Sequence, residues 1–216
     1  MQGNLIFQII NNIQINLYNY KLFQYLNFSV GKTSLLNRYS KNEFSLKYKE
    51  TIGADFLTKL VERGEDTIQL QLWDTAGTEK YHSMGSSFYR NTEACILVFD
   101  LTNPDTFKSI ENWRTTFLDQ LNPSEPNLYP FILIGNKSDL NNNIQNIQSE
   151  IDNFCKEHNN MPFFMTSAKD NINLEEAFNK IIDLALEKNA KSDENFVPSK
   201  NLKLVPEKPK KKKKCC

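Results

Sequence analysis

The chain has 216 residues, of which 39% are hydrophobic and 12% aromatic, enough to bury the core of one ordinary globular domain with length left over. The formal net charge is zero, but Lys208 and Lys210–Lys214 carry six positive charges at one end, so the remainder carries a net charge of about −6. No apolar run is long enough to span a bilayer and no secretory signal opens the sequence, so we expect neither a membrane span nor secretion.

The first 28 residues differ in kind from the rest. Asparagine and glutamine are mixed irregularly with Ile, Leu, Tyr and Phe, without the period of a helix or a strand. The expected first strand, over Tyr20–Leu26, is therefore doubtful. Since most of these residues have A- and T-rich codons, we hypothesise that Met1–Phe28 is translated non-coding sequence. Sequencing the 5′ end of the transcript tests this, and a message that encodes these residues as written contradicts it.

From Gly31 onward, strand-like apolar runs alternate with helix-like segments, which predicts an α/β fold with helices on both faces of a mostly parallel sheet of six strands. The expected strands after the doubtful first one are Asp55–Arg63, Thr67–Trp73, Ala94–Asp100, Phe131–Gly135 and Pro162–Met165. The expected helices are Thr33–Tyr39, Thr106–Gln120, Ile147–His158 and Leu174–Lys188. The turn-rich link Arg63–Asp66 predicts one antiparallel hairpin.

These patterns divide the chain into three parts. We expect an atypical N-terminal segment over residues 1–28, one globular domain over residues 29–189, and a flexible tail over residues 190–216. The tail is expected to be unpacked because the composition turns polar after Asn189 and includes three prolines.

Val30–Ser34 read Val-Gly-Lys-Thr-Ser, the second half of a phosphate-binding P-loop. In such a loop, backbone amides and a helix N-terminus hold phosphate, Lys32 meets the β and γ phosphates, and Thr33 binds magnesium. Alone, a Gly-Lys-Thr stretch is more often an accidental surface loop. Asp74 supports the phosphate interpretation because it ends an apolar strand, from which it can reach magnesium through water, while the Gly77 amide can approach the γ-phosphate.

Two loops after later strands have the composition of a guanine pocket. Asn136, Lys137 and Asp139 follow one strand, which puts a carboxylate where it can accept hydrogen bonds from guanine N1 and the exocyclic amine. Adenine lacks this donor pair, so an unmet buried carboxylate would disfavour it. Ser167–Lys169 follow the next strand and are expected to present a backbone amide to guanine O6. Each motif alone can be surface-loop chemistry, but four in order, each after a strand, predict a nucleotide site.

Further stretches resemble the Rab family of Ras-like small GTPases. They are Thr51–Phe56, Leu70–Asp74 and Leu97–Thr102. With the motifs above, the resemblance covers Val30 to about Lys188, and Thr51–Lys59 and Asn122–Leu140 are most similar to the late-endosomal and lysosomal branch. The resemblance implies the P-loop NTPase fold and a GTPase that binds GTP or GDP with Mg²⁺ and recruits trafficking effectors.

The resemblance also implies roles for single residues. The expected nucleotide contacts are Ser29, Val30, Gly31, Lys32, Thr33, Ser34, Phe44, Tyr48, Thr51, Gly77, Asn136, Lys137, Asp139, Ser167, Ala168 and Lys169. The expected magnesium site is Thr33, Thr51 and Asp74, and the catalytic positions are Lys32, Gly77 and Thr78. Phe44 is expected to flank the guanine and Lys137 to stack over it. The effector-binding triad corresponds to Phe56, Trp73 and Phe88, although three such aromatics can also be core residues.

Three departures from the family matter. Thr78 stands where the family has the glutamine that orients the attacking water, so we expect weak intrinsic hydrolysis. Leu26, Asn27 and Phe28 replace the first half of the P-loop, and Leu26 stands where glycine permits the turn, at a cost of about 1–3 kcal/mol for the same backbone. The third departure is the poorly alternating first strand.

The last residues form a lysine run followed by Cys215 and Cys216. A bare lysine run is most often a solvated tail, an import signal or a nucleic-acid patch. The terminal cysteines instead resemble the doubly prenylated Rab terminus, since two lipids anchor durably and the lysines favour an anionic leaflet. The other cysteines, Cys95 and Cys155, lie in apolar stretches, and the set has no disulfide or metal spacing.

Two hypotheses about function follow. The first is a Rab-type GTPase on the cytoplasmic face of late endosomes, lysosomes or related membranes, with a cytosolic pool. Its expected partners are exchange factors, GTPase-activating proteins, GDP-dissociation inhibitor or escort protein, and trafficking effectors, without nucleic acid. The second is a pseudo-GTPase scaffold that binds effectors without a working cycle. GTP affinity and turnover distinguish the two.

Overall fold

The computed structural model of the protein describes residues 17–25, 29–47, 54–64, 66–75, 89–140 and 144–194. The strands are β1 (Leu17–Tyr25), β2 (Ala54–Arg63), β3 (Asp66–Thr75), β4 (Ala94–Asp100), β5 (Phe131–Asn136) and β6 (Phe163–Met165). The α-helices are α2 (Lys32–Lys41), α3 (Asp105–Lys108), α4 (Ile110–Leu121), α5 (Gln148–Glu157) and α6 (Leu174–Glu194). Short 3₁₀ turns lie at Pro126–Leu128, Ser138–Leu140 and Ile144–Asn146. No helix within these ranges is both long and apolar enough to cross a membrane.

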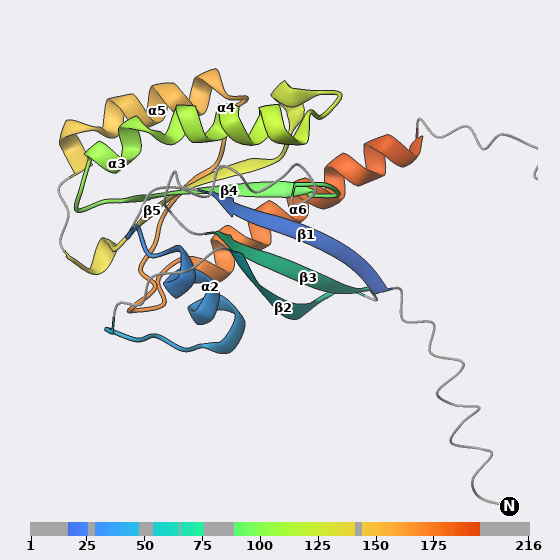
Figure 1. Cartoon of the computed structure of the whole chain (residues 1–216), viewed down its shortest axis with the longest axis horizontal. Helices are drawn as coiled ribbons and strands as arrows, with labels where there is room; N and C mark the ends of the chain where they lie inside the picture. The colour runs from blue at the N-terminus through green and yellow to red at the C-terminus, as the bar shows by residue number, and fades with distance from the viewer. Residues whose placement is uncertain are drawn as a thin grey trace, which may run out of the picture.

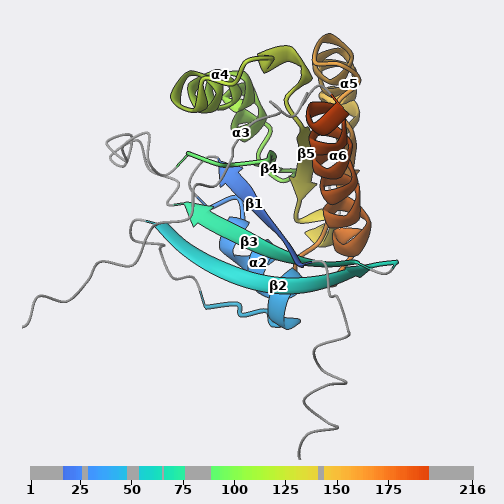
Figure 2. The ribbon, with the colours of Figure 1, turned by 90° about the vertical axis from the view of Figure 1, so that its right-hand side faces the viewer.

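The strands form one sheet of six in the order β2-β3-β1-β4-β5-β6. Among the strands that the structure describes, only β2 runs antiparallel to its neighbour, and Figure 2 shows it outermost, beside β3. Arg63 pairs with Asp66 across the predicted hairpin, and Gly64 adopts the left-handed conformation (φ 62°) that such a tight turn requires. The predicted fold class, the parallel sheet and the hairpin are confirmed.

The structure contains the first strand that the sequence left doubtful, over Leu17–Tyr25. β1 lies in the centre of the sheet, parallel to both β3 and β4, with Leu22 opposite Leu72 on one side and Ala94 on the other. Tyr, Phe and Leu suit a pleated strand, and pairing on both edges compensates for poor alternation. Residues 17–25 are therefore part of the sheet, and the boundary predicted at residue 28 stays a prediction. The hypothesis about the transcript stays a prediction.

Helices cover both faces of the sheet. In Figure 1, α3, α4 and α5 form a layer above β4, while α2 lies below the sheet and α6 crosses behind it. Phe107 of α3 packs edge-on against Phe154 of α5 at 5.8 Å between ring centroids, which joins the upper layer. On the other side, Tyr39 of α2 stacks on Phe178 of α6 at 3.7 Å.

Two predicted helices differ from the structure. The single helix expected over Thr106–Gln120 is divided into α3 and α4 at Ser109, whose hydroxyl bonds to the carbonyl of Thr106 at 3.2 Å and competes with helical hydrogen bonding. Helix α6 continues to Glu194, past the expected start of the tail at residue 190. The change to a polar composition after Asn189 therefore does not mark the end of the helix.

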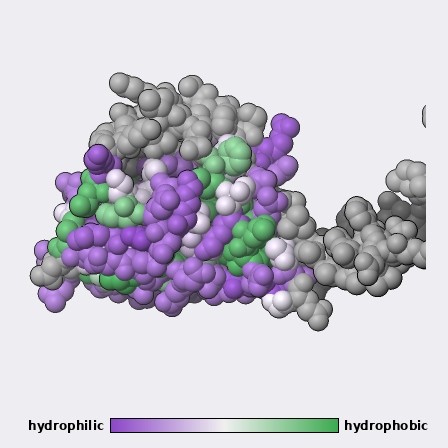
Figure 3. Space-filling view, turned by 90° about the horizontal axis from the view of Figure 1, so that it is seen from below, coloured by the Kyte–Doolittle hydropathy of each residue, from purple (hydrophilic) through white to green (hydrophobic). Residues whose placement is uncertain are grey.

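The core lies between the sheet and its two helical layers. Every residue of β4 and β5 is buried, as expected for central parallel strands covered on both faces. The largest fully buried side chains are Phe99, Phe117, Phe178, Leu35, Leu36, Ile68, Leu70, Leu72 and Ile96. The face seen in Figure 3 is mostly hydrophilic, with separate hydrophobic patches. The carboxyl ends of β1, β3, β4, β5 and β6 share one edge, where loop residues from distant parts of the chain meet.

Candidate functional site

The start of α2 has the geometry of an anion-binding turn. Gly31 is the N-cap of α2, with φ 90° and ψ 27°, so the first amides of α2 have no partner within the helix and can bind an anion. A side chain is excluded at this position, because an added Cβ would lie 2.5 Å from Nδ2 of Asn136. Ser29 also has a positive φ of 64°. Glycine at position 31 is therefore required both by the backbone and by the space.

Lys32, the first residue of α2, is a buried cation at this turn. Only 6% of its surface is exposed. Burial lowers the pKa of its ammonium to about 8, against the attraction of nearby Asp74, which raises the pKa. A poorly hydrated positive charge beside a helix N-terminus suits a multiply charged phosphate, which would replace the lost hydration.

The two predicted magnesium residues in the described part of the chain are in contact. Thr33 Oγ1 donates to Oδ2 of the buried Asp74 at 2.5 Å, across a separation of 41 residues. Mg²⁺ prefers oxygen ligands and keeps waters and substrate phosphates in its shell, so one hydroxyl and one carboxylate are an adequate protein contribution. The donor set therefore fits Mg²⁺, although the described residues contain no cluster of three or more His, Cys, Asp or Glu that would hold a metal alone.

Asn136 joins the phosphate turn to the base loops. Its Nδ2 donates to the carbonyl of Val30 at 2.9 Å, and its Oδ1 accepts from Thr166 Oγ1 and from the Ala168 amide, both at 3.3 Å. The side chain is buried, with 2% exposure. Asn136 therefore connects its own loop to the phosphate turn and to the loop after β6. The Ala168 amide, which was expected to face guanine O6, donates to Asn136 in this structure.

Asp139 is the carboxylate expected to read the base. Its Oδ1 accepts a hydrogen bond from Ser167 Oγ at 2.7 Å, and Lys169 Nζ lies 3.6 Å from Oδ2. The side chain is 6% exposed. The Ser167 hydroxyl also accepts from the Asp170 amide at 3.0 Å, so the loop fixes its position. A carboxylate oriented from one side in this way can accept two parallel N–H bonds from a planar ligand.

Arg38 was not found by sequence reasoning, yet it contacts three parts of the site. Its Nε donates to the carbonyl of Ala168 at 2.8 Å and its Nη2 to that of Lys169 at 3.0 Å. Its guanidinium also lies 5.8 Å from the ring centroid of Phe44, the aromatic expected beside the guanine. Arg38 thus fixes the base loop to the helix that begins at the phosphate turn. Its partners lie about 130 residues away, so no local spacing could indicate it.

Of the effector triad, Phe56 and Trp73 stack across the β2–β3 pair with centroids 5.6 Å apart, and Phe56 is 56% exposed. Phe56 is therefore a surface aromatic and not a core residue. Several predicted site residues lie outside the described residues: Tyr48, Thr51, Gly77, Thr78, Phe88, Cys215 and Cys216. So do Leu26, Asn27 and Phe28. Ser34 lies in the first turn of α2, half-buried.

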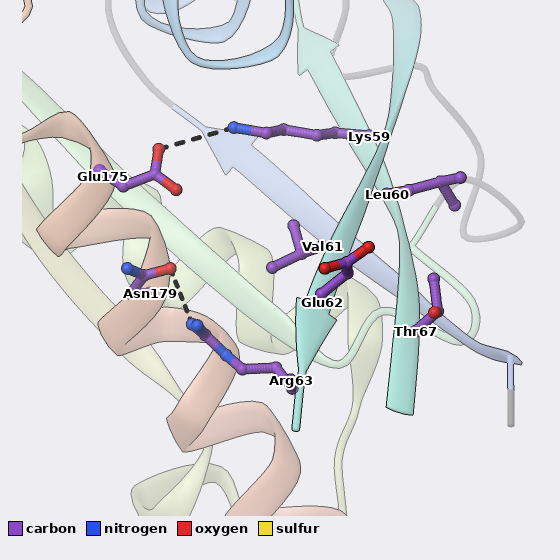
Figure 4. A pocket seen from close by; sticks show the side chains of 8 residues that line it. All are labelled: Lys59, Leu60, Val61, Glu62, Arg63, Thr67, Glu175 and Asn179. Atoms are coloured by element: carbon purple, nitrogen blue, oxygen red, sulfur yellow. Dashed lines mark hydrogen bonds and ion pairs between the residues drawn. The ribbon is translucent and has the colours of Figure 1, made fainter. Parts of the chain in front are cut away.

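Two surface pockets lie elsewhere. One, of about 830 Å³, is between β2 and α6, where Figure 4 shows Lys59 directed at Glu175 and Arg63 at Asn179. The other, of about 900 Å³, lies beside Tyr129 and the C-terminal part of α6. Neither pocket is lined by a predicted site residue. The candidate site is instead the cluster at the carboxyl edge of the sheet, which comprises Gly31, Lys32, Thr33, Asp74, Asn136 and Asp139.

Comparison with known proteins shows the family of the chain. The family model "Ras family" matches residues 27–187. The chain is 46% identical over 165 residues to the Ras-related protein Rab7 of Drosophila melanogaster, covering 76% of this chain and 79% of that protein. It is 47% identical over 166 residues to the Ypt/Rab-type GTPase ypt7 of Schizosaccharomyces pombe, covering 76% and 80%. A GTP-binding protein of Volvox carteri, yptV5, is 46% identical over 170 residues, covering 78% and 82%.

Proposed function

The chain belongs to the Ras family of small GTPases and, within it, to the Rab7 and Ypt7 branch of the Rab proteins. We propose that the cluster at the carboxyl edge of the sheet is its guanine-nucleotide site. The protein is a GTPase of vesicle trafficking at the late endosome or vacuole. The matches to GTPases give no support to the alternative of a scaffold without nucleotide cycling.

The observation that carries the proposal is the position of Asp139. Its carboxylate is held by Ser167 in a loop that Asn136 ties to the phosphate turn. The acceptor for the base is therefore fixed relative to the amides and the ammonium that would bind the phosphates. Guanine offers N1–H and an exocyclic amine on one edge, and adenine does not, so this carboxylate selects guanine.

At the phosphate end, the Gly31 turn and Lys32 would bind the β and γ phosphates, and Thr33 and Asp74 would hold Mg²⁺ together with Thr51. The ion would neutralise phosphate charge and orient the γ-phosphate. The Thr33 hydroxyl could keep its hydrogen bond to Asp74, because its oxygen lone pairs would remain available to the ion. Gly77 would then donate its amide to the γ-phosphate, and the segment around Thr51 would respond to the presence of that phosphate.

The same nucleotide-dependent segments would select partners. Phe56 and Trp73 form an aromatic pair at the surface of the β2–β3 hairpin, and with Phe88 they constitute the proposed effector surface. Exchange factors and GTPase-activating proteins would act on the nucleotide, and GDP-dissociation inhibitor or escort protein on the lipidated form. The proposed anchor is Cys215 and Cys216, carrying two prenyl groups on the cytoplasmic face of the membrane.

Selectivity for guanine tests the proposal. We expect the full chain to bind GTP and GDP with Mg²⁺ at least a hundredfold tighter than ATP, by about 3 kcal/mol. Asp139→Asn should lose guanine affinity and gain affinity for xanthine nucleotides, whose exchanged hydrogen-bonding pattern suits an amide. Asp119→Asn, at an exposed position of α4, is the matched control and should behave as the unchanged protein. Comparable ATP and GTP affinities in a nucleotide-titration assay would contradict the site.

A further inference from the structure

Asp100, the last residue of β4, lies at the same edge as the nucleotide motifs. β4 and β5 pair so that Asp100 is opposite Asn136, which brings it beside Lys137. The residue is buried, with 6% exposure. Burying a carboxylate costs free energy unless the group is paired and hydrogen-bonded. The partners of Asp100 therefore indicate its role.

Both carboxylate oxygens are occupied. Oδ2 lies 2.6 Å from Lys137 Nζ. Oδ1 accepts from the Thr102 amide at 2.9 Å and from the Thr102 hydroxyl at 2.7 Å. The backbone is fixed as well, since the Leu101 amide donates to the Asn136 carbonyl at 3.0 Å. The carboxylate is therefore a rigid anchor for the ammonium of Lys137.

Lys137 needs such an anchor. Its φ of 70° is the left-handed conformation that side-chain-bearing residues rarely adopt. Its side chain is 30% exposed, and lysine carries a large rotamer entropy, so an exposed Lys137 without a fixed partner would sample many positions. Holding the ammonium at Asp100 restricts the aliphatic stem to one path beside the base loop.

We propose that Asp100 is a positioning residue of the guanine site: it holds Lys137 by its ammonium so that the lysine stem forms one face of the slot for the base. The inference rests on the proposed nucleotide site. Because the stem is ordered before the nucleotide arrives, binding costs less side-chain entropy, and the bound base is retained longer. Asp100 acts only through Lys137 and does not touch the nucleotide.

Asp100→Asn separates this role from a structural one. An asparagine keeps an oxygen for the two Thr102 bonds but loses the charge that holds Lys137. Asp105→Asn is the matched control, because Asp105 also pairs with a lysine, Lys108, at 2.7 Å, but on the exposed surface of the adjacent helix. We measure dissociation of fluorescently labelled GDP from the full chain in Mg²⁺, together with thermal unfolding of each variant.

We expect GDP to leave Asp100→Asn about tenfold faster, equivalent to about 1.4 kcal/mol, and Asp105→Asn at the unchanged rate. Lys137→Met should also release GDP faster, and combining it with Asp100→Asn should add nothing, because Asp100 has then no lysine to hold. Asp100→Glu keeps the negative charge but displaces it, so its GDP dissociation rate should lie between those of the unchanged protein and Asp100→Asn. If Asp100→Asn fails to fold, Asp100→Glu takes its place in the test.

Two results would overturn the proposal. The first is an unchanged GDP dissociation rate in Asp100→Asn and in Asp100→Glu. The second is multiplication of the two effects in the double variant, which would show that Asp100 acts independently of Lys137. If the unchanged protein itself bound no GDP, the nucleotide site would be wrong, which is a separate outcome from either of these.

Discussion

Asn136 and Asp139 belong to one short motif, yet their side chains have different tasks. The Asn136 amide is directed into the protein, where it bonds to the Val30 carbonyl and the Ala168 amide. Asp139 is the middle residue of the 3₁₀ turn, and its carboxylate is oriented by Ser167. Removing the first should therefore loosen the whole site, whereas removing the second should change which base is preferred.

We propose that Thr78 limits intrinsic GTP hydrolysis. It stands where the family has the glutamine that orients the attacking water, and we expect its short side chain not to reach that water. We expect an intrinsic rate at or below the ~10⁻⁴ per second scale of glutamine-bearing Ras. Thr78→Gln should raise the intrinsic rate several-fold in a single-turnover GTP hydrolysis assay.

The same assay with a Rab-directed GTPase-activating protein provides the control for Thr78. Such proteins, as a family, supply an arginine and a glutamine of their own, so the assisted rate should differ little between Thr78 and its Gln variant. Equal intrinsic rates in the two proteins would show that another residue positions the water, and would refute this role of Thr78.

At the scale of elements, sequence patterns predicted the strands that are buried on both faces. β4 and β5 are continuous apolar runs, and β4 has the predicted bounds while β5 extends one residue further. The first strand was predicted over Tyr20–Leu26 but left doubtful, because the stability of β1 comes from pairing with β3 and β4, which the pattern of a single strand does not contain. The division between α3 and α4 was not predicted, because it depends on the hydrogen bond from the Ser109 hydroxyl to the Thr106 carbonyl.

The candidate site shows the same contrast. Lys32, Thr33 and Asp74 were predicted because their motifs are local and their chemistry is specific, and the structure brings them together. Arg38 and Asp100 could not be predicted, because their partners are fixed only by the fold. A cation in an amphipathic helix and an aspartate at a strand end are otherwise common surface features.

Helix α2 is also joined to β2 and α6 through Tyr39. Its ring stacks on Phe178 of α6, and the ammonium of Lys59 from β2 lies 3.5 Å from the ring centroid. Lys59 also donates to the Tyr39 carbonyl at 2.9 Å, on the side of β2 that Figure 4 shows facing α6. The Tyr39 hydroxyl is buried and has no hydrogen-bond partner among the residues that the structure describes.

Tyr39→Phe should therefore be neutral or slightly stabilising, because it removes a buried hydroxyl without breaking a hydrogen bond and keeps the ring contacts. Tyr129→Phe is the matched control: its buried hydroxyl donates to the Thr92 carbonyl at 2.8 Å, so its loss should cost about 1–2 kcal/mol. Urea unfolding of the GDP-bound proteins measures both. A loss in Tyr39→Phe as large as that in Tyr129→Phe would show that the Tyr39 hydroxyl has a partner.

At the scale of the whole molecule, the lysine run and the proposed lipid anchor lie apart in sequence from the residues of the proposed nucleotide site. The six lysines near the C-terminus oppose a net charge of about −6 on the rest of the chain. The family match ends at residue 187, and the last described helix ends at Glu194. The cationic end can therefore meet an anionic leaflet while the acidic body is repelled from it.

The four cysteines also fall into two groups, one in the domain and one at the C-terminus. Burial raises the pKa of the Cys155 thiol to about 11 and that of Cys95 well above its usual range, so neither forms a thiolate readily. Cys215 and Cys216 lie beyond the last described helix, at the end of the lysine run. The proposed lipidation therefore concerns the terminal pair alone.

Replacing Cys215 and Cys216 with serine should move the protein from the membrane fraction to the cytosolic fraction of cells that express it, without changing GDP binding. One remaining lipid gives only marginal, reversible anchoring, so Cys216→Ser alone should give a mixed distribution. Cys155→Ser is the control, since it removes a thiol from the domain and should stay on membranes. Persistent membrane association of the double variant would contradict the lipid anchor, and lost GDP binding would contradict the independence of tail and site.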